Sequence, residues 1–132
     1  MADSRSDARE HALSLLYEAE SKRCSIEAVI DAQVVPCDEA TEVVARGVGR
    51  DQGSLDALIG RFSTGWSVER MPSIDRIVLR IASFELLHRS DVPTAVILNE
   101  AVELAKRFST EDSGRFVNGV LAAIAREVRA DR

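Results

Sequence analysis

The sequence predicts an all-α protein, and three observations support this expectation. Apolar residues recur at spacings of three and four along most of the chain, as they do on the buried face of a helix. Strand-like alternation with a period of two never extends beyond a few residues. Aromatic residues make up only 5% of the composition, so aliphatic side chains must supply the core. At 132 residues, the chain is long enough for one domain or for two tightly packed subdomains.

The first half of the chain begins with two predicted helices. The first covers about Ser6 to Lys22, and its small and aliphatic residues share one face. These residues are Ala8, Ala12, Leu15, Leu16 and Ala19. The second helix runs from Ile26 to about Val34, and Pro36 ends it.

A third predicted helix follows Asp38, a residue type suited to an N-cap. Three glycines weaken this helix, because each glycine inside a helix costs about 1 kcal/mol relative to alanine. They are Gly47, Gly49 and Gly53. An apolar face resumes from Leu55 to Phe62 and stops at Ser63-Thr64-Gly65, where we place the subdomain boundary.

The second half has clearer helix signals. Pro72 suits a first helical turn, and the helix after it has an apolar face broad enough for a central, largely buried position. That helix ends near His88. The next runs from about Thr94 to Phe108. Ser109 and Asp112 resemble a capping box for a last helix.

The composition limits the class of protein. With 45% hydrophobic and 30% charged residues, the chain is globular. Its net charge of −5 argues against nonspecific nucleic-acid binding, so any nucleic-acid function must depend on a local basic patch. Cys24 and Cys37 fit no paired zinc spacing, and we expect reduced thiols in a cytoplasmic protein; a disulfide between them is the less favoured alternative. Nothing resembles a secretory leader or a membrane span.

The distribution of reactive groups argues against an enzyme. His11 and His88 lie far apart in the sequence, and neither has a companion at metal-ligand spacing. No glycine-rich loop follows a strand, and there is no nucleophile elbow. We therefore expect no catalytic residue, no metal and no cofactor.

Two polar pairs lie on otherwise apolar helices, Asn99-Glu100 and Asn118-Gly119. A buried amide or carboxylate costs free energy unless it is paired. We favour the interpretation that Asn99 or Glu100 turns inward and hydrogen-bonds a neighbouring helix or loop; the alternative is a polar site on an exposed groove. Asn118-Gly119 predicts a close helix approach at Gly119, with Asn118 hydrogen-bonding across it.

Basic residues surround an aromatic one at the turn between the last two predicted helices. Lys106 and Arg107 precede Phe108, and Arg115 follows it. As structural features, the cations suit a helix C-terminus and Asp112 suits a first turn. As functional features, an aromatic ring can stack an unpaired base while cations contact phosphates. The residue types do not choose between the two.

Several motifs together resemble the NusB family of transcription antitermination factors. They are the pattern ARE-x-A-x-x-x-LYEAE at 8–20, Trp66, IDRIVLRIASFELL at 74–87, VPTAVILNEAVELAKRF at 92–108 and DSGRFVNGVL at 112–121. The resemblance implies two small packed helical bundles, with three helices over about residues 1–64 and four over about residues 65–132. It also implies that the protein, together with the ribosomal protein NusE, binds the boxA element of rRNA leader transcripts in the RNA polymerase antitermination complex. Similar domains occur attached to rRNA cytosine methyltransferases, but we expect a standalone factor.

The same resemblance implies roles for individual residues. RNA contacts fall on Arg5, Arg9, Tyr17, Lys106, Phe108, Asp112 and Arg115, the NusE contact falls on Asp75, and Asn99, Glu100, Asn118 and Gly119 support the framework. Family members often carry consecutive arginines at the N-terminus, whereas this chain interleaves acids with Arg5 and Arg9. Fewer cations weaken RNA binding. We therefore expect weak boxA binding by the protein alone, with NusE supplying much of the affinity.

Two functions follow from these observations. The leading one is a non-enzymatic RNA-binding and scaffolding factor. The alternative is a protein-interaction module, a homodimer formed through exposed apolar residues of the first or the central helix, in which RNA binding is weak or lost.

Overall fold

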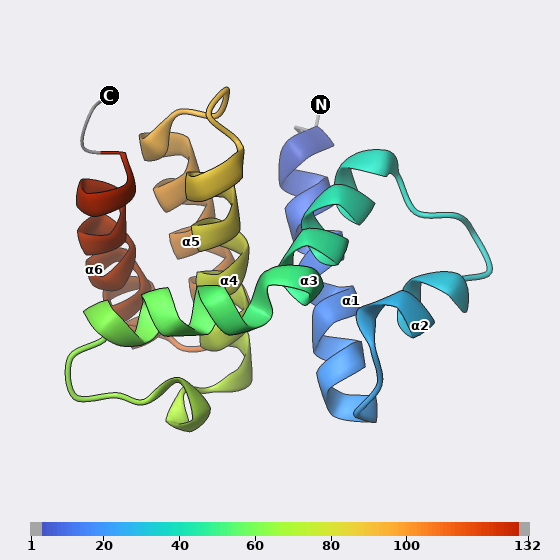
Figure 1. Cartoon of the computed structure of the whole chain (residues 1–132), viewed down its shortest axis with the longest axis horizontal. Coiled ribbons are helices and arrows are strands. Elements are labelled where there is room, and N and C mark those ends of the chain that lie inside the picture. Colours follow the sequence, from blue (N-terminus) through green and yellow to red (C-terminus); the bar gives the residue numbers. More distant parts are fainter. Residues whose placement is uncertain (1–3, 130–132) are drawn as a thin grey trace.

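The structure describes residues 4–129 of this computed structural model, and the regular elements in these residues are all helices, with no strand. The helices are α1 (Ser4–Lys22), α2 (Ile26–Asp31), α3 (Glu39–Phe62), α4 (Ser73–His88), α5 (Thr94–Phe108) and α6 (Glu111–Val128), with a 3-10 turn, η1 (Val68–Arg70), before α4 (Figure 1). The prediction of an all-α protein is confirmed.

Helix α4 lies at the centre of the core. All its residues from Ile77 to Leu86 are buried, and it contacts α1, α3, α5 and α6. Pro72 occupies its N-cap with φ −55°, a value that the proline ring favours at a helix start. One of its charged residues, Arg80, is paired with Asp56 on α3 at 2.7 and 2.9 Å. The predicted central position and the predicted end at His88 are both confirmed.

Helix α3 connects the two ends of the molecule and remains continuous through its glycines. Figure 1 shows it extending from the side of α1 and α2 to the side of α4 and α6. A Cβ at Gly47 would lie 2.2 Å from the Phe84 ring, and one at Gly49 would lie 2.5 Å from Ile26. These glycines therefore allow α4 and α2 to approach closely, which compensates for their low helix propensity.

The arrangement after residue 65 contains three α-helices and η1, and α3 packs against α4 and α6 from before that point. Residues 39–62 thus supply a further helix beside α4 and α6. The division of the chain into subdomains near residue 64 stays a prediction.

Helix boundaries differ from the prediction at two places. Helix α2 ends at Asp31 rather than near Val34, and Val34 is 98% exposed. Proline also disfavours helical backbone in the residue before it, so the segment ahead of Pro36 leaves the helix early. The cap of α6 lies one residue later than predicted, because Thr110 and Ser113 form the reciprocal side-chain to backbone hydrogen bonds at 3.1 and 3.3 Å.

Candidate nucleic-acid and protein interface

Three cations, Lys106, Arg107 and Arg115, lie at the end of α5 and the start of α6, and we call this region the basic edge. The first turn of α6 also carries the exposed acids Glu111 and Asp112. Lys106 and Arg115 are both exposed there. Gly114 is buried, and a Cβ on it would lie 2.7 Å from Cγ of Lys106. The aliphatic stem of Lys106 therefore lies across α6 at Gly114, the residue before Arg115. The sequence analysis did not identify Gly114 as the point where α5 and α6 approach closely. Its position between Lys106 and Arg115 in the sequence could have indicated this role.

Arg107 and Phe108 lie together on the same edge. The guanidinium carbon of Arg107 is 4.7 Å from the centroid of the Phe108 ring, a cation–π distance. Its Nη1 also donates a hydrogen bond to Glu10 of α1 at 2.8 Å. Phe108 is 42% exposed, so its ring can still meet another molecule.

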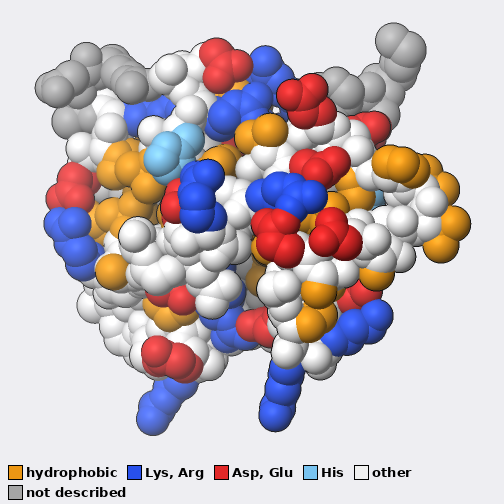
Figure 2. Space-filling view, turned by 45° about the vertical axis from the view of Figure 1, so that its right-hand side comes forward, with side chains coloured by type: hydrophobic (Ala, Val, Ile, Leu, Met, Phe, Trp, Pro, Cys, Tyr) orange, Lys and Arg blue, Asp and Glu red, His pale blue; other side chains and the backbone are white. Residues whose placement is uncertain are grey.

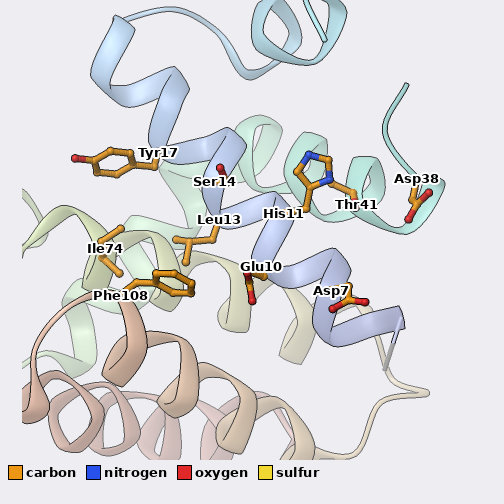
Figure 3. A pocket seen from close by; sticks show the side chains of 10 residues that line it. All are labelled: Asp7, Glu10, His11, Leu13, Ser14, Tyr17, Asp38, Thr41, Ile74 and Phe108. Atoms are coloured by element: carbon orange, nitrogen blue, oxygen red, sulfur yellow. The ribbon is translucent and has the colours of Figure 1, made fainter. Parts of the chain in front are cut away.

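A groove of 640 Å³ borders this edge, between α1, the start of α3 and the end of α5 (Figure 3). Its apolar lining includes Leu13, Tyr17, Ile74 and Phe108, of which the two aromatic rings are partly exposed. The remaining lining residues are Asp7, Glu10, His11, Ser14, Asp38 and Thr41. The lining carries three carboxylates and neither lysine nor arginine, so the groove repels phosphate and attracts cations.

A smaller hollow of 230 Å³ lies beside the first turn of α4. The rings of Trp66 and Phe116 line it with their centroids 6.0 Å apart, and Asp75 and Asp112 border it. Asp75 is only 3% exposed, and its Oδ1 has no hydrogen-bond partner in the described residues. A buried carboxylate without a donor is costly, so this hollow favours a ligand that supplies a cation or an N–H group. Ile74 in the groove and Asp75 here are consecutive, so both depressions border the same turn.

Arg9 does not lie on this surface, contrary to the prediction that it contacts RNA. It is 4% exposed, and its Nε and Nη2 donate to the two carboxylate oxygens of Glu85 at 2.7 and 2.9 Å. Its Nη1 lies 3.6 Å from Glu100. Arg9 therefore joins α1 to α4 and α5 inside the protein. Arg5 remains exposed and donates to Asp91 at 3.2 Å.

The two polar pairs have different outcomes. Glu100 turns toward α1, where it accepts a hydrogen bond from the Ser6 hydroxyl and lies near Arg9, so the inward interpretation is confirmed for Glu100. Asn99 is exposed. The framework roles predicted for Asn118 and Gly119 are wrong, because both are exposed and a Cβ on Gly119 would meet nothing within 4 Å. These positions lie on the outer face of α6.

The helices expected to form a homodimer contact offer little apolar surface. In the described part of the chain, the large exposed apolar residues of α1 and α4 are Tyr17 and Leu87. The aliphatic residues of both helices are used in the core. The homodimer contact on these helices stays a prediction.

Cys24 and Cys37 are free thiols, as predicted. Burial raises the pKa of the Cys37 thiol, and the nearby carboxylates of Glu42 and Asp38 raise it further. Within residues 4–129, no helix is long and apolar enough to cross a membrane, and no three His, Cys, Asp or Glu side chains are grouped to hold a metal ion.

Comparison with known proteins gives a consistent family. The model of the NusB family matches residues 6–126. The transcription antitermination protein NusB of Sorangium cellulosum is 46% identical over 136 residues, covering 97% of this chain and 96% of that protein. The NusB of Pseudarthrobacter chlorophenolicus is 43% identical over 124 residues, covering 91% of both chains.

Solved structures agree with this result. The T. maritima NusB structure superposes with a TM-score of 0.86 at 36% identity, covering 96% of this chain and 94% of that one. A crystal structure of the antitermination factors NusB and NusE in complex with dsRNA superposes with a TM-score of 0.78 at 25% identity, covering 96% and 98%. The chain therefore belongs to the NusB family.

Proposed function

We propose that this protein is a transcription antitermination factor that binds boxA RNA of rRNA leader transcripts together with NusE. Its curated relatives are transcription antitermination proteins, and one solved relative is complexed with NusE and double-stranded RNA. In this chain, the proposal rests on one observation. At the end of α5, the basic edge adjoins an acidic groove that is partly lined by aromatic rings. The site of action is the bacterial cytoplasm, within the RNA polymerase antitermination complex.

The basic edge is the proposed RNA face. Lys106 and Arg115 contact phosphates, and Phe108 stacks on an unpaired base. Asp112, exposed in the first turn of α6, accepts a hydrogen bond from a base edge. Arg5 adds a phosphate contact at the start of α1. Arg9 is excluded from this set because its guanidinium is buried against Glu85.

The groove is the proposed protein face. Its three carboxylates oppose an RNA backbone but suit a basic segment of a ribosomal protein. Tyr17 lines this groove from α1, so we transfer it from the RNA face to the NusE face, whereas Phe108 borders both the groove and the basic edge and stays assigned to RNA. The hollow at Asp75 continues the same face, and a donor from NusE would pair the buried Oδ1 of Asp75, which has no hydrogen-bond partner in the described residues.

A titration with three components tests the proposal. Labelled boxA RNA is titrated with this protein, with and without NusE, and binding is followed by fluorescence anisotropy. We expect weak binding by the protein alone and tighter binding with NusE. Nanomolar affinity of the isolated protein at physiological salt would contradict the expectation that NusE supplies much of the RNA affinity.

Variants test the two faces separately. Lys106→Gln and Arg115→Gln should weaken RNA binding and leave NusE binding unchanged, whereas Tyr17→Ala and Asp75→Asn should weaken NusE binding. Lys22→Gln is the matched control, because Lys22 is an exposed cation at the far end of α1 and pairs locally with Glu18. Equal losses of RNA affinity in Lys22→Gln and Lys106→Gln would show that only net charge matters.

A further inference from the structure

Arg107 is a cation of the basic edge whose charge is already engaged. Its side chain is 53% exposed, yet it bridges two features of different function. One contact is the Phe108 ring, on the proposed RNA face. The other is the carboxylate of Glu10, whose oxygen accepts its hydrogen bond at 2.8 Å.

Glu10 belongs to the groove as well as to this ion pair. It lines the groove from α1, and its side chain is 44% exposed. Figure 3 shows Glu10 and Phe108 on the facing sides of α1 and the end of α5. A cation entering the groove would therefore compete with Arg107 for the same carboxylate. Exposed ion pairs are weak, amounting to a factor of at most about five in an equilibrium constant, so such an exchange is easily driven.

We propose that Arg107 is a further phosphate-binding residue of the RNA face, and that Glu10 masks it until a basic protein segment occupies the groove. This inference rests on the proposed function, because it assigns the groove to a basic partner and the edge to RNA. When the partner's cation pairs with Glu10, the Arg107 guanidinium keeps its contact with Phe108 and turns its N–H groups to a phosphate. The coupling is reciprocal, so RNA bound at Arg107 also frees Glu10 for the partner.

The proposal gives a physical reason for partner-dependent affinity. An RNA-binding residue paired with a carboxylate must lose that pair before it meets a phosphate, so it contributes little to binding by the isolated protein. A partner that supplies its own cation removes this cost. The effect is local to one ion pair, which distinguishes it from a general reduction of negative charge.

The experiment compares Glu10→Gln, Arg107→Gln and the double variant in boxA RNA titrations, with and without NusE, over a series of salt concentrations. Glu103→Gln is the matched control, since Glu103 is an exposed acid of α5 with no ion pair in the described residues. Glu10→Gln should raise the RNA affinity of the isolated protein by about two- to fivefold. It should also steepen the salt dependence by about 0.7, the value for one more phosphate contact on a single strand.

The other two variants test whether the effect of Glu10→Gln depends on Arg107. Arg107→Gln should lower RNA affinity mainly when NusE is present, and the double variant should behave like Arg107→Gln alone. An equal gain in Glu103→Gln, or a gain that survives in the double variant, would overturn the masking role. If Glu10→Gln binds boxA RNA no more tightly than the wild type does, the masking role is overturned too. The proposed function still stands in that case, provided that the wild type binds RNA and NusE. If the wild type with NusE binds no boxA RNA, the proposed function fails and the masking role fails with it.

Discussion

The buried ion pair between Arg9 and Glu85 gives a sharp prediction of stability. Replacing Arg9 by methionine keeps most of its volume but removes the bidentate guanidinium from the Glu85 carboxylate, which is only 2% exposed. The Arg9 guanidinium holds both carboxylate oxygens of Glu85, at 2.7 and 2.9 Å. Removing one partner of a buried pair typically costs about 3–5 kcal/mol, and we expect Arg9→Met to fall in that range.

The neighbouring carboxylate makes the effect asymmetric. If Glu85 is replaced by methionine, Arg9 still has Glu100, whose Oε1 is 3.6 Å from its Nη1. We therefore expect Glu85→Met to cost less, about 1–3 kcal/mol. The double variant should recover much of the loss, because a buried pair can often be replaced by apolar side chains at little net cost.

Urea denaturation of the three variants, followed by circular dichroism, measures these differences. At a chain length like this one, a loss of about 4 kcal/mol corresponds to a fall in Tm of roughly 10–15 °C. A loss below about 1 kcal/mol for Arg9→Met, with an unchanged denaturant slope, would refute the assignment of a paired and desolvated charge. Equal losses for the two single variants would refute the role given to Glu100.

Three other predictions concern separate parts of the fold. Gly114→Ala should lower the free energy of unfolding by about 1–3 kcal/mol, because the new Cβ would lie 2.7 Å from Cγ of Lys106. Gly119→Ala should raise the free energy of unfolding by up to about 1 kcal/mol, because a Cβ there meets nothing within 4 Å. Chemical denaturation of the two variants checks both values. Arg129→Gln should cost about 3 kcal/mol in the same assay, since that buried guanidinium donates to four backbone carbonyls at the end of α4 and in the turn after it. The hydrogen bond from Arg50 lowers the pKa of the Asp51 carboxyl from its usual value of 3.8. The stabilisation that this ion pair contributes is therefore present above pH 3.8 and is lost as the pH falls through the lowered pKa. NMR titration should show the pKa of Asp51 rising in Arg50→Gln.

The site could be predicted from sequence only where a local signal existed. Lys106, Phe108 and Arg115 were identified from one turn, and all three are exposed in the structure, while their RNA contacts stay a prediction. Arg9 was misassigned because a helical arginine near a chain start gives no sign of its burial. Its partner Glu85 is 76 residues away, and no periodicity connects the two. Gly119 was chosen over Gly114 for a similar reason, since only the packing of α5 on α6 shows which glycine is covered.

The sequence by itself determined the helical class, the extent of α5, the central burial of α4 and the family, because these depend on apolar periodicity, on prolines at helix starts and on short motifs. Tertiary structure alone decided which charges are available. Helix packing buried Arg9 against Glu85, joined Glu10 to Arg107 and gathered carboxylates from α1 and from the N-cap of α3 into one groove. The physical reason is that the free energy of a charge depends on its nearest partners and on its contact with water, and both are set by residues distant in the chain.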